Sequence, residues 1–77
     1  MIDLSDPNTD VEKLYKSFVL DMKLYSRLFS INHICGWCRD WNVANQLAFI
    51  WMELGYINLF MDDALPPDYK IYEFRRY

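Results

Sequence analysis

Residues 29–57 read FSINHICGWCRDWNVANQLAFIWMELGYI, and this stretch decides the fold. Ser30 is a favourable N-cap residue and predicts a short helix over residues 31–38. Residues 39–42 then break the helical period with cap-forming side chains, which predicts a turn that contains Trp41. The apolar positions of the short helix are Ile31, Ile34, Cys35 and Cys38.

A second helix is expected over residues 43–54, with Asn42 as its N-cap and Gly55 as the left-handed residue that ends it. Its apolar residues repeat at helical spacing and should face a core. Two helices joined by a tight turn form a candidate helix-turn-helix. The expected core face consists of Leu47, Ala48, Ile50, Trp51 and Leu54.

On the N-terminal side, Thr9 and Glu12 form a capping-box pattern, which predicts a first helix from Asp10 to about Ser26. Residues 1–9 mix acids with proline and asparagine, as an arm or a loop does. Apolar residues recur at helical spacing along the predicted helix and indicate that it is amphipathic. They are Val11, Leu14, Tyr15, Phe18, Met22 and Tyr25.

After Gly55 the pattern changes from helical to extended. Residues 56–61 and 69–74 are rich in β-branched and aromatic side chains and predict two strands, and the acidic, proline-containing residues 62–68 predict the loop of a hairpin. The expected fold class is therefore mainly α with a C-terminal β-hairpin. A single core should contain Leu14, Phe18, Ile34, Leu47, Trp51, Leu54 and Ile57.

Composition limits the possible functions. A chain of 77 residues with 53% hydrophobic content can build one core, and its formal charge of −3 gives no general attraction to a phosphate backbone. Charged residues interrupt every apolar run before it reaches the ~18–20 residues of a membrane span. The N-terminus lacks the basic-then-apolar order of a secretory signal, so a cytoplasmic location without membrane contact is expected.

Three segments carry a family resemblance: residues 29–35, the turn at residues 40–42, and residues 51–57, which run from the predicted helix into the hairpin. Together they resemble the winged-helix family of small transcriptional regulators and related interaction domains. The resemblance implies a winged helix-turn-helix of three helices plus a wing over residues 10–77, with residues 1–9 as an N-terminal arm.

In that family the third helix enters the DNA major groove and basic residues of the wing contact phosphates. The positions that match those roles here are Asn42, Asn45, Gln46, Phe49, Met52 and Glu53 for the helix and residues 62–68 for the wing. The residues that the DNA alternative would use are Arg39, Asn42, Asn45, Gln46 and Lys70. Asn45 and Gln46 can read adenine edges. The wing, however, contains three aspartates and no basic residue before Lys70, which opposes binding to a polyanion.

A protein partner, or a second copy of the chain, suits this surface better than DNA. Phe49 and Met52 remain on the predicted third helix after its core positions are assigned, and apolar side chains favour a protein contact. The leading hypothesis is a non-enzymatic regulator or adaptor that binds protein through the third helix and the hairpin, with sequence-specific duplex DNA binding as the alternative. The predicted partner-binding residues are Asn45, Phe49, Met52 and Trp41.

Two further groups of residues have the chemistry of possible sites. Acidic residues of the wing and of the arm (Asp3, Asp6 and Asp10) can imitate phosphates, which gives a third hypothesis of an inhibitor of a nucleic-acid-binding protein, as mobile elements encode. His33, Cys35 and Cys38 read as His-x-Cys-x-x-Cys, but a structural zinc site needs a fourth ligand. Packed, reduced thiols are therefore expected, with no metal, no cofactor and no catalytic residues.

Overall fold

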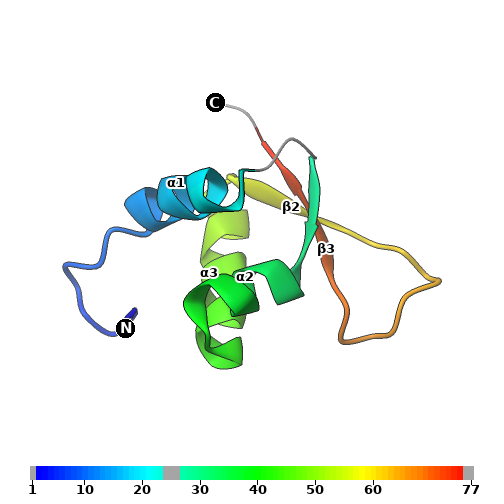
Figure 1. Ribbon diagram of the computed structural model, residues 1–77, viewed down its shortest axis with the longest axis horizontal. Coiled ribbons are helices and arrows are strands. Elements are labelled where there is room, and N and C mark those ends of the chain that lie inside the picture. The colour runs from blue at the N-terminus through cyan, green and yellow to red at the C-terminus, as the bar shows by residue number, and fades with distance from the viewer. Residues whose placement is uncertain (1, 24–26, 76–77) are drawn as a thin grey trace.

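The computed structural model describes residues 2–23 and 27–75. Three helices and one antiparallel sheet of three strands, in the spatial order β1-β3-β2, make up the described chain (Figure 1). In chain order the elements are α1 (Val11–Met22), β1 (Leu28–Ser30), α2 (Ile31–Cys38), α3 (Trp41–Glu53), β2 (Ile57–Phe60) and β3 (Ile71–Phe74).

The strand β1 corrects the expectation that all strands lie in a C-terminal hairpin. It pairs with β3 in the register Leu28 to Glu73 and Ser30 to Ile71, while β2 pairs with the other edge of β3. The chain is therefore a small mixed α/β unit. A three-residue strand has too little sequence to show a period, and it forms here because β3 offers it an unpaired edge.

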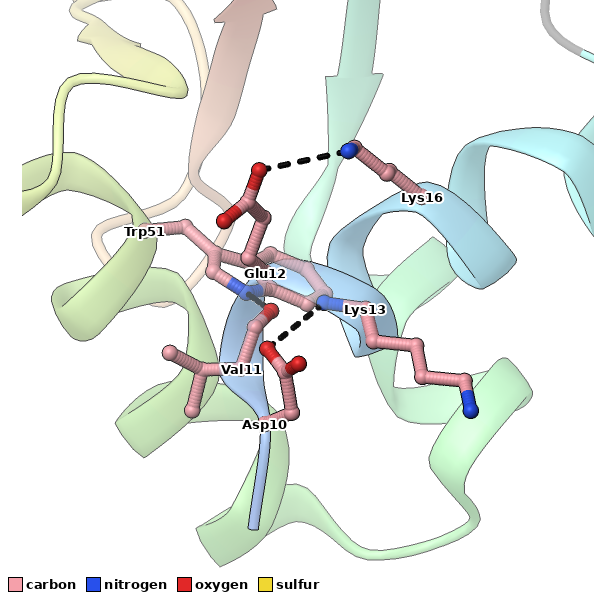
Figure 2. Close-up of polar contacts among 6 residues, drawn as sticks. All are labelled: Asp10, Val11, Glu12, Lys13, Lys16 and Trp51. Atoms are coloured by element: carbon pink, nitrogen blue, oxygen red, sulfur yellow. Dashed lines mark hydrogen bonds and ion pairs between the residues drawn. The ribbon is translucent and has the colours of Figure 1, made fainter.

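The start of α1 differs from the capping-box prediction. The Asp10 carboxylate accepts a hydrogen bond of 3.1 Å from the Lys13 N–H and is the N-cap (Figure 2). The Thr9 hydroxyl instead donates to the Asp3 carbonyl. Glu12 instead forms an exposed ion pair of 3.2 Å with Lys16. A carboxylate is the stronger acceptor next to the positive end of a helix, which favours Asp10 over its neighbour.

The end of α1 is also earlier than predicted. The helix ends at Met22, and Lys23 adopts a left-handed conformation with φ of 49° while its N–H donates to the Leu20 carbonyl. The helix therefore ends before Lys23. Residues 24–26 of the predicted helix lie outside the described residues.

Asp40, not Asn42, caps α3. Its carboxylate accepts hydrogen bonds from the N–H groups of Asn42 (2.9 Å) and Val43 (3.2 Å), so Trp41 is the first helical residue and does not lie in a turn. Two predictions beside it are confirmed. Ser30 is the N-cap residue of α2, and Gly55 follows α3 with a φ of 82° that favours glycine.

The helices and the inner face of the sheet enclose one aromatic core. Phe18 and Trp51 are fully buried and stack with their ring centroids 5.6 Å apart. The Trp51 indole N–H donates to the Val11 carbonyl at 2.9 Å, which ties α3 to the first residue of α1 (Figure 2). The predicted core residues confirmed as buried are Phe18, Ile34, Leu47, Trp51 and Ile57.

Two predicted core residues behave differently. Leu14 is half-buried and packs against the edge of the core, but Leu54 is 49% exposed and does not belong to it. Leu54 follows the last residue of α3, where the chain turns and the Tyr56 N–H donates to the Trp51 carbonyl at 2.9 Å. The apolar stripe of α3 predicted that Leu54 would be buried, but α3 ends at Glu53, one residue before it.

The helices are short, between 8 and 13 residues. Among the described residues, none of them has the length and apolar character that crossing a bilayer demands. A membrane-spanning helix needs about 20 residues.

Candidate interaction surface

The outer face of α3 is the first part of the candidate surface. The helix turns Ala44, Leu47, Ala48 and Trp51 toward the core. Residues on the opposite side, Asn42, Gln46, Phe49 and Glu53, are exposed. Their spacing of three and four residues places them on one helical stripe.

The four predicted partner-binding residues lie along one flank of this face, because Trp41, Asn45, Phe49 and Met52 follow each other at intervals of three or four residues. Phe49 is 60% exposed and Trp41 is 42% exposed. Asn45 is half-buried and its amide donates to the Trp41 carbonyl at 2.8 Å. Met52 packs partly against the core. Phe49 and Trp41 are thus the accessible apolar side chains of this flank.

The residues of the DNA hypothesis are more scattered. Asn42 and Gln46 lie one turn apart on the outer face of α3, and Arg39 is the exposed left-handed residue between α2 and α3. Lys70 is exposed beside the start of α2, where its carbonyl accepts from the Ile31 N–H at 2.9 Å. Asn45 already uses its amide within the helix. The helix α3 itself contains no lysine or arginine.

The wing, defined as residues 61–70 between β2 and β3, is the second part of the surface. It projects from the sheet as a long loop (Figure 1). Asp62 shapes its start, because its carboxylate accepts from the Ala64 N–H at 3.0 Å and its carbonyl from the Leu65 N–H at 3.1 Å. Asp63 and Asp68 are exposed. The predicted acidic loop is therefore built from local turns.

The apolar side chains at the base of the wing were missed in the sequence. Leu59, Phe60 and Met61 are all exposed, and Met61 is 75% exposed. Side chains of a strand alternate between its two faces, so three consecutive large apolar residues cannot all enter one core. That run was the signal that part of the hairpin would stay uncovered.

The thiols and the histidine do not converge on a site. The His33 Nδ1 accepts a hydrogen bond of 2.9 Å from the Ser30 N–H, and the Cys38 thiol donates to the Asp40 carbonyl at 3.3 Å. Burial raises the pKa of the Cys38 thiol, which disfavours the thiolate needed for nucleophilic attack or metal binding. Within residues 2–23 and 27–75, no group of three or more histidine, cysteine or acidic side chains is placed to hold a metal ion.

The acids of the N-terminal arm serve local structure. Asp3 accepts hydrogen bonds from the hydroxyl and the N–H of Ser5, which lower the pKa of its carboxyl group. Asp6 accepts from the Asn8 N–H, and Asp10 caps α1. These carboxylates therefore already have protein donors.

Comparison with known proteins adds no relative to this picture, because no protein-family model, curated protein or solved structure matches the chain. The residues of α3 and of the wing therefore carry the functional assignment themselves.

Proposed function

We propose that this chain is a winged-helix adaptor or regulator of the cytoplasm, without catalytic activity, that binds a protein partner through α3 and the β2–β3 hairpin. The order of three helices, the tight turn between α2 and α3 and the long loop of the hairpin support the family assignment. The strand β1 extends the sheet at the edge of β3 that is away from β2, and this extra strand is compatible with the family assignment. Two free cysteines suit a reducing compartment.

The exposure of Phe49 carries the proposal. A phenylalanine in the middle of a helix normally faces a core, and this one is 60% exposed. Burial of apolar area contributes about 25 cal/mol per Å², and aromatic residues are frequent anchors of protein interfaces. Trp41 adds a second accessible aromatic ring on the same flank. This arrangement suits a protein surface with a matching apolar pocket.

Charge separates this function from DNA binding. A DNA complex gains much of its affinity from neutralised phosphates, but α3 contributes no basic residue and the wing sets three aspartates against Lys70. The exposed amides of Asn42 and Gln46 favour the alternative of a sequence-specific duplex-DNA regulator. Base contacts alone do not replace the missing phosphate contacts.

The third hypothesis, an acidic inhibitor that imitates phosphates, receives less support. The arm carboxylates Asp3, Asp6 and Asp10 accept hydrogen bonds from their own chain. They are therefore less available to a basic protein than free carboxylates would be.

The test compares Phe49→Ser with Leu28→Ser as a matched control. Leu28 is also an exposed large apolar residue, but it lies on β1 and not on α3. Tagged protein recovered from its source cells should enrich a partner that Phe49→Ser loses and Leu28→Ser retains. With purified components, the Phe49→Ser variant should bind that partner about tenfold or more weakly.

A duplex-DNA titration supplies the contrary outcome. We expect no sub-micromolar binding to pooled duplex at physiological salt. If the protein binds a specific duplex at that strength and requires Arg39 and Gln46, it is a DNA regulator and the adaptor function is wrong.

A further inference from the structure

A second apolar surface lies on α1, away from the face of α3. It is an open groove of ≈ 570 Å³ between α1 and two residues at the end of the hairpin opposite the wing, Tyr56 before β2 and Arg75 after β3. Its apolar lining consists of Tyr15, Val19, Leu20 and Tyr56. Leu20 is 75% exposed although it belongs to a helix that packs on the core. The groove has a volume typical of binding sites.

The rim of this groove carries more positive than negative charge. Lys16 and Arg75 line it together with one acid, Glu12, which already forms an ion pair of 3.2 Å with Lys16. The Arg75 guanidinium donates to the Asn58 side-chain oxygen, which fixes its position beside β2. An occupant with an apolar body and carboxylates at its edge complements such a rim.

The wing and its base have that chemistry. Leu59, Phe60 and Met61 are exposed apolar side chains, and Asp62 and Asp63 follow them directly. Over residues 59–70 three aspartates face one lysine, a net charge of −2. The same chain therefore presents an acidic wing with an apolar base, and an apolar groove with a basic rim.

The sheet register shows that the wing cannot fill the groove of its own chain. Ile57 pairs with Phe74 at the end of the hairpin next to the groove residues Tyr56 and Arg75. Phe60 pairs with Ile71 at the opposite end, where the wing begins. The four paired residues separate the two ends by about 10 Å or more, and the wing points away from α1 (Figure 1).

We infer that the occupant of the α1 groove is the wing of a second copy of this chain. The apolar base of the wing lies against Leu20, Val19 and Tyr56, and the aspartates reach the ammonium and guanidinium groups of the rim. Because wing and groove are different surfaces, two copies either exchange wings reciprocally in a closed dimer or bind head to tail in a ring or a chain of copies. The inference deepens the hairpin half of the proposed function and does not use the α3 half.

The experiment mixes two damaged copies. Phe60→Ser combined with Met61→Ser removes the apolar base of the wing and leaves the groove intact. Leu20→Glu damages the groove and leaves the wing intact. Light scattering and sedimentation equilibrium follow the mass from micromolar to about 1 mM, the range in which weak interfaces become visible. Circular dichroism spectra and melting temperatures establish that each variant is folded.

Wild-type mass should rise with concentration to that of a dimer or beyond, and each variant alone should remain a monomer. The equimolar mixture should form a one-to-one heterodimer and nothing larger, because one intact wing and one intact groove are then used up. Raising the salt concentration should weaken association, since charged groups at the rim contribute. The control Leu28→Ser should associate as the wild type does.

Three outcomes would overturn the inference: a wild type that stays monomeric at about 1 mM, a mixture that does not associate, or a mixture that grows beyond the heterodimer. Phe49→Ser distinguishes this failure from that of the proposed function. Phe49→Ser should leave self-association unchanged while it abolishes binding of the protein partner. Self-association and partner binding can therefore each fail without the other.

Discussion

The aromatic core and the hairpin loop are both rich in large apolar side chains, yet the core is closed and the loop is open. Phe18, Phe29 and Trp51 are buried between the helices and the inner face of the sheet. Phe60 and Met61, at the base of the wing, remain exposed, and the loop that follows them projects away from the helices (Figure 1). Burial thus depends on a second layer of structure and not on the residue type.

The first test of this contrast is the removal of the largest core side chain. Trp51→Ala deletes a fully buried indole that stacks on Phe18 and bonds to the Val11 carbonyl, so we expect a loss of ~3–5 kcal/mol in the free energy of unfolding. A domain of this size has ~5–10 kcal/mol in total, so the loss is a large fraction of its stability and the variant should melt at a much lower temperature. Urea titration followed by circular dichroism measures it, and a loss below ~1 kcal/mol would contradict the role of Trp51 as the centre of the core.

Features with strong local signals were predictable from the sequence. Ser30 and Gly55 each have a residue type that suits one backbone position, and both function as expected. The helical period also placed Asn45, Phe49 and Met52 on one flank of α3, whereas Trp41 was expected in the turn before the helix. Where two neighbouring residues can both be the N-cap, a single sequence does not rank them. This applies to Thr9 and Asp10 before α1, and to Asp40 and Asn42 before α3.

Features that depend on distant partners were not predictable. The strand β1 exists because β3, some forty residues later in the chain, offers an edge. The α1 groove joins Leu20 to Tyr56 and Arg75, which no local pattern connects. The internal hydrogen bond of the Asn45 amide and the partial burial of Met52 likewise follow from packing.

Aspartates in the two regions give a second, smaller test. Asp40 caps α3 with two hydrogen bonds, so Asp40→Ala should cost about 1 kcal/mol. Asp62 bonds to one N–H within an exposed turn of the wing, and Asp62→Ala should change stability by less than about 0.5 kcal/mol. Chemical denaturation of both variants under identical conditions measures the difference. Equal losses would show that the wing is as tightly integrated as the helices.

Alkaline pH should act on the core through Tyr72. Burial raises the pKa of its hydroxyl above the usual 10.0, so the folded state holds this proton more tightly than the unfolded state. The stabilisation is complete below the unfolded pKa and is lost as pH rises through the folded pKa. Cys38 acts in the same direction from its usual 9.0, also because of burial. The free energy of unfolding should therefore fall from about pH 9 upward.

Two variants separate these contributions. Tyr72→Phe removes the buried hydroxyl and should flatten the upper part of the decline, above about pH 10. Cys38→Ala should flatten the lower part. Unfolding measured at closely spaced pH values checks both, and a stability that rises with pH in this window would reverse the assigned sign.

The smallest effect is expected in the wing. Phe60→Ser together with Met61→Ser removes two large apolar side chains, the same kind of change that should be severe in the core. Met61 lies outside the strand and is 75% exposed, and Phe60, the last residue of β2 and the register partner of Ile71, is 48% exposed. We expect a change in the free energy of unfolding within about 0.5 kcal/mol, or a few degrees in melting temperature, at concentrations low enough to keep the chain monomeric. A loss approaching that of Trp51→Ala would mean that the wing packs on its own domain, and its apolar residues would then not be available to a second copy.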